Sequence, residues 1–161
     1  MKKSKPLIIK LDAIIKDTES ESKVIREDSI LNNLLSIENS VLKYNQIGLN
    51  YYNRGKYDKA IESFQKALHS EGESASIHYN LGLAYQAKGL LDEAAKEYKR
   101  SLELNPSDAE AHNNLGIIYH SLDQDNKAIA EFREAIRIDP EFELAKRNLE
   151  RVTRKDGSRN L

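Results

Sequence analysis

The sequence predicts an all-α protein, a right-handed α-solenoid of three helix-turn-helix units with a helical extension before them and a capping helix after them. Two observations predict this architecture. The chain repeats itself with a period of 34 residues, and within each period apolar and small residues recur at the helical spacings i, i+4, i+7 and i+8. Such a period is typical of stacked helical repeats, in which each unit buries its apolar face against the next.

The repeat is clearest at small and aromatic positions. It divides residues 41–142 into the units 41–74, 75–108 and 109–142. We expect the small residues to let the two helices of a unit approach closely, with an aromatic ring wedged against the neighbouring helix. The residues that superimpose after a shift of one period are Gly48, Gly82 and Gly116, then Ala60, Ala94 and Ala128, then Phe64, Tyr98 and Phe132.

Turn signals divide each unit into two helices. Gly55 and Gly89 stand between the halves, where the end of a helix favours a left-handed residue, and Asp123 is a tolerable substitute in the third unit. Pro106 and Pro140 stop the second helices. We therefore expect helix pairs at 41–54 and 57–71, at 75–88 and 91–104, and at 109–122 and 125–138.

The regions on either side of the repeats are predicted separately. Residues 143–156 continue a helical pattern and are expected to cap the last unit, and residues 157–161 are expected to be a disordered tail. We interpret residues 23–40 as an N-terminal capping helix and residues 1–22 as a flexible segment with a short amphipathic helix. The apolar face of that helix, a candidate self-assembly element, consists of Leu7, Ile8, Leu11, Ile14 and Ile15.

Three docking modes are open to this amphipathic face. It can dock on the protein's own repeats, exchange onto those of a neighbouring copy, or bind a partner or a membrane surface. Docking on protein, own or neighbouring, is favoured because four lysines and one acidic residue accompany only a modest apolar face.

Composition excludes several classes of function. The 25 basic and 26 acidic residues leave a net charge of −1, which argues against nucleic acid as a partner. No apolar stretch approaches the roughly 20 residues of a membrane-spanning helix, and no signal-peptide cleavage site is apparent, so a cytoplasmic location is expected. The sequence has no cysteine, phosphate-binding loop or nucleophile motif. We predict a protein without enzymatic activity, cofactor or metal.

The four histidines support that prediction. His78 and His112 are one period apart, so we interpret them as half-buried packing residues and not as metal ligands. Carboxylates such as Asp92 and Glu131 are expected on helix exteriors, where charges are normally solvated.

The repeat resembles a known family. Asn80-Leu81-Gly82-x-x-Tyr85, followed by Ala94, Tyr98, Ser101 and Pro106, is similar to the tetratricopeptide repeat, and the resemblance covers residues 41–142. The second and third units depart from it by carrying histidine where the first has Tyr44. Gly72 replaces the terminal proline of the first unit.

The resemblance implies a protein-interaction module, an adaptor or scaffold. In this family the first helices of the units line a concave groove that binds an extended or helical segment of another protein. Amide side chains can pair with a peptide backbone whatever its sequence, because each offers donors and an acceptor. The predicted groove residues are Asn45, Leu49, Tyr52, Asn53, Tyr79, Asn80, Leu83, Gln86, Asn113, Asn114, Ile117 and His120.

Two family precedents refine the choice of partner. Asn80 and Asn114 are similar to the asparagine ladder that holds peptide backbone in the O-linked N-acetylglucosamine transferase. The repeat domains that bind the C-terminal carboxylate of heat-shock chaperones use Lys, Asn, Asn, Lys and Arg, because a desolvated carboxylate needs paired charge. At those positions this chain has Asn45, Leu49, Asn80, Glu110 and Asn114.

Only one of the five positions matches, so that partner class is excluded. Two alternatives to an adaptor remain open. One is a specialised chaperone that resembles the three-repeat chaperones of bacterial secretion systems. The other is a scaffold that self-assembles into a homo-oligomer through its N-terminal segment.

Overall fold

The computed structural model describes residues 43–157 of the 161-residue chain. These residues belong to one compact unit, Ser40–Leu161. The predictions made for residues 1–22 and 23–40, including the amphipathic face, lie outside the described residues, as does most of the predicted tail.

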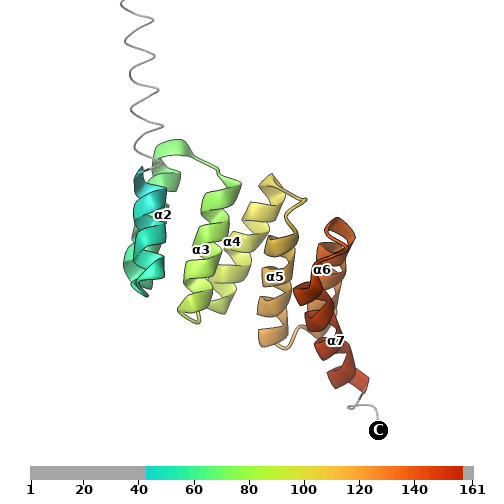
Figure 1. Ribbon diagram of the computed structural model, residues 1–161. Coiled ribbons are helices and arrows are strands. Elements are labelled where there is room, and N and C mark those ends of the chain that lie inside the picture. The colour runs from blue at the N-terminus through green and yellow to red at the C-terminus, as the bar shows by residue number, and fades with distance from the viewer. Residues whose placement is uncertain (1–42, 158–161) are drawn as a thin grey trace, which may run out of the picture. The chain divides into compact units, whose positions relative to one another are not determined.

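The described part of the chain is helical and holds no strand. Consecutive helices pack side by side in chain order (Figure 1). The predicted all-α solenoid is confirmed, and each complete helix begins and ends within one residue of its predicted limits. The helices are a first segment at 43–53, α2 (Tyr57–Glu71), α3 (Ala75–Ala87), α4 (Leu91–Leu104), α5 (Ala109–Ser121), α6 (Asp125–Ile138) and α7 (Glu143–Gly157).

Each pair of helices is held together by an aromatic ring that fills the space of a missing side chain. The ring of Tyr98 on α4 lies against Gly82 of α3, where an added Cβ would come within 2.7 Å of two ring carbons. Tyr98 is fully buried. The same arrangement recurs in the other two units, with Phe64 against Gly48 and Phe132 against Gly116.

These rings belong to the apolar core. Phe64 packs in a cluster with Ile77 and Leu81 of the next unit, and Tyr98 and Phe132 belong to a second cluster, so burial crosses the boundary between units. The second cluster extends to Val152 of α7, which is fully buried. Complete burial of such a side chain contributes about 1.5–3 kcal/mol, which explains why α7 packs against α5 and α6.

The turns between paired helices have the backbone conformation that the sequence predicts. Gly55 and Gly89 have positive φ angles of 70° and 78°, and Asp123 takes the same place with a φ of 55°. Aspartate is one of the few residues with a side chain that tolerate this region. The three turns are therefore equivalent, although only two of them use glycine.

Replacing Gly82 with alanine tests the ring contact, because the contact decides whether the substitution lowers or raises the free energy of unfolding. Alanine is favoured over glycine by about 0.8–1.0 kcal/mol inside a helix, so without a steric conflict Gly82→Ala would stabilise the protein. We expect the opposite, a loss of about 1–3 kcal/mol, because the new Cβ collides with a fully buried ring. Urea unfolding followed by circular dichroism measures the difference, and a stabilised variant would contradict the proposed contact.

Candidate functional site

The predicted groove residues lie on three successive first helices, namely segment 43–53, α3 and α5. Most of them are neither buried nor fully exposed, whereas the apolar residues on the opposite side of the same helices, such as Leu81 and Leu115, are 2% exposed. We call the part-exposed set the inner row. It consists of Asn45, Leu49, Tyr52, Tyr79, Asn80, Leu83, Gln86, Asn114, Ile117 and His120. Asn53 is exposed, and Asn113 is buried.

Asparagine side chains tie the first helices to one another. The Nδ2 of Asn80 donates to Oδ1 of Asn45 at 3.0 Å, and the Nδ2 of Asn114 donates to the hydroxyl of Tyr79 at 3.1 Å. In both bonds the donor lies 35 residues after the acceptor. An amide has two N–H donors and a carbonyl acceptor, so one contact leaves capacity for others. The amides therefore join the units while still facing the inner row.

A third hydrogen bond of the same kind lies under the last helix. We call these three side-chain hydrogen bonds the amide ladder, and each of them a rung. The Nδ2 of Asn148 on α7 donates to Oδ1 of Asn113 at 2.9 Å, again 35 residues apart. Asn113 is 1% exposed and Asn148 is 6% exposed. Asn113 is one of the predicted groove residues, but it lies beneath α7. Asn148 was not identified as part of the ladder, although it follows Asn114 by one period of 34 residues.

Tyr79 is the centre of the middle rung. Its hydroxyl accepts from Asn114 and donates to Oε2 of Glu110 at 3.2 Å. Burial, and next the charge of Glu110, raise the pKa of Tyr79 to about 12. The hydroxyl therefore stays protonated near neutral pH and continues to donate to Glu110. Glu110 places a negative charge beside the inner row.

The last residue of the inner row differs in kind from unit to unit. Tyr52 packs against the ring of Tyr57, with 5.6 Å between centroids. Gln86, its equivalent, accepts from the hydroxyl of Tyr98 at 2.7 Å. His120 in the third unit bonds Oδ1 of Asp125 through Nδ1 at 2.6 Å. This edge of the row therefore changes from a phenol to an amide to an imidazole.

Apolar side chains run through the middle of the inner row. Leu49, Leu83 and Ile117 occupy the same position of the three units and are each only partly buried. Amides, a tyrosine hydroxyl and a histidine flank them. Part-exposed apolar groups beside fixed hydrogen-bonding groups are suited to binding a polypeptide, whose side chains are apolar and whose backbone is polar.

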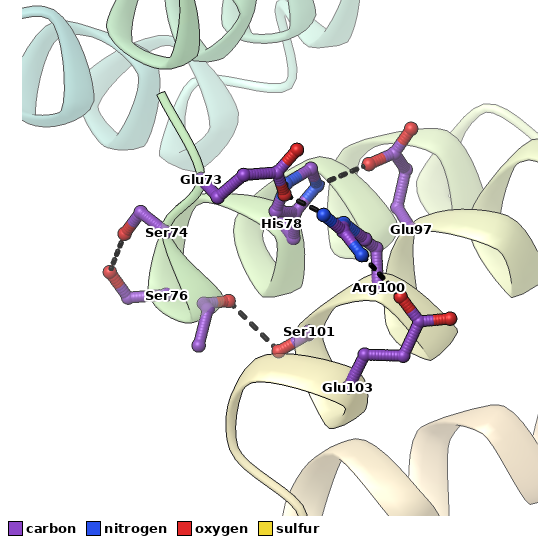
Figure 2. A network of polar contacts seen from close by, with 9 residues as sticks. Glu73, Ser74, Ser76, His78, Glu97, Arg100, Ser101 and Glu103 are labelled. Carbon is purple, nitrogen blue, oxygen red and sulfur yellow. Dashed lines mark hydrogen bonds and ion pairs between the residues drawn. The ribbon is translucent and has the colours of Figure 1, made fainter. Parts of the chain in front are cut away.

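A separate polar network lies where the loop after α2 meets α3 and α4 (Figure 2). His78 is 8% exposed, and its Nδ1 lies 2.7 Å from Oε2 of Glu97. Glu73 contacts both His78, at 3.1 Å, and the guanidinium of Arg100, at 2.6 Å. Arg100 also pairs with Glu103. The network uses the histidine as a packing and hydrogen-bonding residue, as predicted.

The third unit repeats the histidine–glutamate contact. Nδ1 of His112 lies 2.7 Å from Oε2 of Glu131, and Nε2 lies 3.2 Å from the carbonyl of Pro106. Glu131 was expected to be solvated, but its side chain is only 23% exposed because it pairs with this ring. Burial opposes protonation of His112, but the bonds to Glu131 and Pro106 and the charge of Glu134 outweigh it and raise the pKa.

Two negative observations concern residues 43–157 alone. No group of three or more histidine, aspartate or glutamate side chains among them is arranged to hold a metal ion. No helix in this range is long and apolar enough to cross a membrane.

The chain matches a protein-family model in two overlapping ranges. The model described as tetratricopeptide repeat matches residues 45–107 and again residues 84–141. The two matches together cover more than half of the chain and all six helices from segment 43–53 to α6. No curated protein matches this chain at a significant level.

Solved structures with the same fold come from several proteins. The first TPR of Spaghetti (RPAP3) bound to an HSP90 peptide superimposes with a TM-score of 0.71 at 20% identity, over 74% of this chain and 94% of that one. The second TPR domain of human RPAP3, in complex with an HSP70 peptide, gives 0.69 at 22% identity, over 73% and 98%. MamA gives 0.72 at 29% identity, over 80% and 75%.

Removing Asn148 tests the buried rung. In Asn148→Ala the Oδ1 of Asn113 is left buried without its donor, and we expect the free energy of unfolding to fall by about 1–3 kcal/mol. Asn114→Ala removes the equivalent amide at a part-exposed rung, where water can replace it, and should cost less. Denaturant unfolding of both variants compares the two rungs. Equal losses would contradict the distinction drawn between them.

The raised pKa of His112 predicts a pH-dependent contribution to stability. Protonated His112 stabilises the fold fully below its unfolded-state pKa, and this contribution is lost as the pH rises through the higher folded-state pKa. His112→Gln should therefore destabilise more at about pH 5.5 than at about pH 8.

Urea unfolding of both proteins across this range measures the difference. Glu131→Gln serves as the control, because it keeps the histidine but removes the charge beside it and should flatten the pH dependence. A loss on His112→Gln that is the same at both pH values would contradict the assignment.

Proposed function

We propose that this chain, which belongs to the tetratricopeptide repeat family, works as an adaptor that holds a segment of another protein along its inner row. The partner segment lies across segment 43–53, α3 and α5. Its backbone pairs with the amides, and its apolar side chains pack against the strip formed by Leu49, Leu83 and Ile117.

The observation that carries this proposal is the incomplete burial of that apolar strip. Ile77 and Ile118, on the same helices but facing the core, are 2% and 1% exposed, whereas Leu83 and Ile117 stay partly accessible. Covering accessible apolar surface contributes about 25 cal/mol for each Å² removed from water. A partner that supplies apolar groups therefore gains free energy at this strip.

The amide ladder supports the same proposal. A partner's backbone carries donors and acceptors that lose water on binding, and each needs a replacement partner. Asn80 and Asn114 are already held in place by hydrogen bonds to the preceding unit. Binding a partner therefore costs little additional side-chain entropy at these two residues. The RPAP3 domains, bound to HSP90 and HSP70 peptides, are examples of this fold with a peptide ligand.

The negative charge of Glu110, beside the inner row, disfavours ligands that bind through a C-terminal carboxylate. Glu110 lies at one of the positions where the family's carboxylate-binding domains carry a lysine. Its carboxylate accepts from the hydroxyl of Tyr79, so the negative charge is fixed beside the row. A C-terminal carboxylate would be repelled there, and we propose an internal, uncharged or basic segment as the partner.

Ligands for the test are selected from a displayed library of random peptides by their binding to the full chain. We expect the selected peptides to bind Leu83→Ala roughly tenfold more weakly than the unmodified protein, because a central apolar contact at an interface is worth more than 1 kcal/mol. Isothermal titration calorimetry measures the affinities, and thermal unfolding confirms that the variant is folded.

Leu104→Ala is the matched control. Leu104 is 41% exposed at the end of α4, outside the inner row, so its truncation should leave the affinity unchanged. The proposal fails if the selected peptides bind Leu83→Ala as tightly as they bind the unmodified protein.

A further inference from the structure

A cleft of about 600 Å³ lies outside the inner row. It follows the exposed side of α4 and reaches the turn between α5 and α6. Its floor is apolar and consists of Ala95, Tyr119 and Leu122, and charged side chains surround it. This volume is in the range of sites that hold several side chains of a ligand.

Two lysines converge on one ring in this cleft. The Nζ of Lys99, on α4, lies 5.6 Å from the centroid of Tyr119, and the Nζ of Lys127, on α6, lies 5.3 Å from the same centroid. Tyr119 is 6% exposed, so the ring is a fixed floor. Both lysines are exposed and make cation–π contacts with this ring, and the Nζ of Lys127 also donates to Oε1 of Gln124 at 2.8 Å.

These lysines lack the acidic partners that the neighbouring arginine has. Arg100 pairs with Glu73 and Glu103, but none of Lys96, Lys99 and Lys127 forms an ion pair with a carboxylate of residues 43–157. Two further carboxylates line the cleft. Asp92 forms no ion pair with residues 43–157, and Glu97 is bonded to His78. Four acidic and four basic side chains line the cleft as a whole, so the positive charge is local to the lysines and is not a net charge of the cleft.

The equivalent junction one unit earlier shows that the lysines are not required for packing. There the ring is Tyr85, and the positions of Lys99 and Lys127 are occupied by Gln65 and Glu93. Gln65 donates to the hydroxyl of Tyr85 at 3.3 Å. The same helix packing is thus achieved with an amide and a carboxylate, so the pair of lysines is a local feature of the junction between α4 and α6.

We propose that the cleft between α4 and α6 is a second protein-binding surface, which takes an acidic peptide segment of a partner protein. A glutamate or aspartate carboxylate of that segment bridges Lys99 and Lys127 above the ring of Tyr119. A neighbouring apolar side chain of the same segment packs on Ala95 and Leu122. This surface is formed by α4, the C-terminal end of α5 and the start of α6, and it does not share residues with the inner row.

The ligand is acidic because the ammonium groups of Lys99 and Lys127 converge on one ring without a carboxylate partner among residues 43–157, and it is a peptide because of the floor. Two ammonium groups over one ring attract an anion, and the apolar floor needs a ligand that also brings apolar groups. A simple inorganic anion would leave the floor exposed to water. Both requirements are met by acidic residues interspersed with leucine.

The test uses two synthetic peptides of equal length, one with glutamate alternating with leucine and one with glutamine in place of glutamate. Each is titrated into the full-length, isotopically labelled protein and followed by nuclear magnetic resonance. We expect the acidic peptide to shift backbone signals around Tyr119 and to bind more weakly as salt is added. The glutamine peptide should bind at least roughly tenfold more weakly.

The decisive variant is Lys99→Gln with Lys127→Glu, which copies the residues of the preceding junction and should therefore keep the fold. It should bind the acidic peptide roughly tenfold more weakly or not at all. Lys56→Gln with Arg147→Glu makes the same change in net charge at two exposed sites outside the cleft, and it should leave the affinity unchanged.

Three results would overturn the proposal. One is that the unmodified protein does not bind the acidic peptide at millimolar concentration. Another is that the glutamine peptide binds equally well. The third is that the two double variants lose affinity equally, which would show attraction by net charge alone. Ligands selected for the inner row should bind the Lys99→Gln, Lys127→Glu variant normally, so the two surfaces are tested independently.

Discussion

The structure depends on an aromatic ring that occupies the place of a missing Cβ. Gly82 has no side chain, and the ring of Tyr98 lies in the space that a Cβ would occupy, so α3 and α4 meet at this point through the ring. The same contact in the other units gives three helix pairs of equal geometry. Because the pairs are equal, side chains 34 residues apart line up across the first helices and across the second helices. The inner row and the cleft between α4 and α6 both follow from this alignment.

The amides of the ladder differ in how much of their hydrogen-bonding capacity the fold uses. Each asparagine of the ladder uses one donor to hold the preceding unit and has further capacity for a ligand. Where α7 covers the rung, as at Asn113 and Asn148, the amides serve the fold alone. Where no helix covers it, as at Asn80, the same geometry leaves ordered polar groups partly exposed. Whether the amides at one sequence position are buried or accessible therefore depends on what packs over them.

The sequence was sufficient to predict the helices and the turns, because both depend on local patterns. The period gave the helix pairs, and Gly55, Gly89 and Asp123 gave the turns. It was not sufficient to predict which inner-row residues remain accessible. Asn113 has the same place in the period as Tyr79, and its burial depends on the packing of α7. The pairing of Glu131 with His112 was missed for a similar reason, since a carboxylate on a helix exterior becomes half-buried only when a neighbouring helix brings a histidine to it.

Differences between the units carry the functional information that the common pattern lacks. Gln65 and Glu93 at one junction correspond to Lys99 and Lys127 at the next, and the helix packing is the same. The repeat therefore fixes where side chains stand, and substitutions at exposed or part-exposed positions decide what each surface can bind.

The most direct test of this account is a double-mutant cycle between Gly82 and Tyr98. It measures Gly82→Ala in the unmodified protein and in a Tyr98→Leu background, with the free energy of unfolding as the observable. The account predicts that alanine is destabilising beside the tyrosine ring but neutral or stabilising beside leucine, with a coupling energy of about 1–3 kcal/mol. If Gly82→Ala changes the stability equally in both backgrounds, the ring and the glycine act independently, and the contact does not set the spacing of the helices.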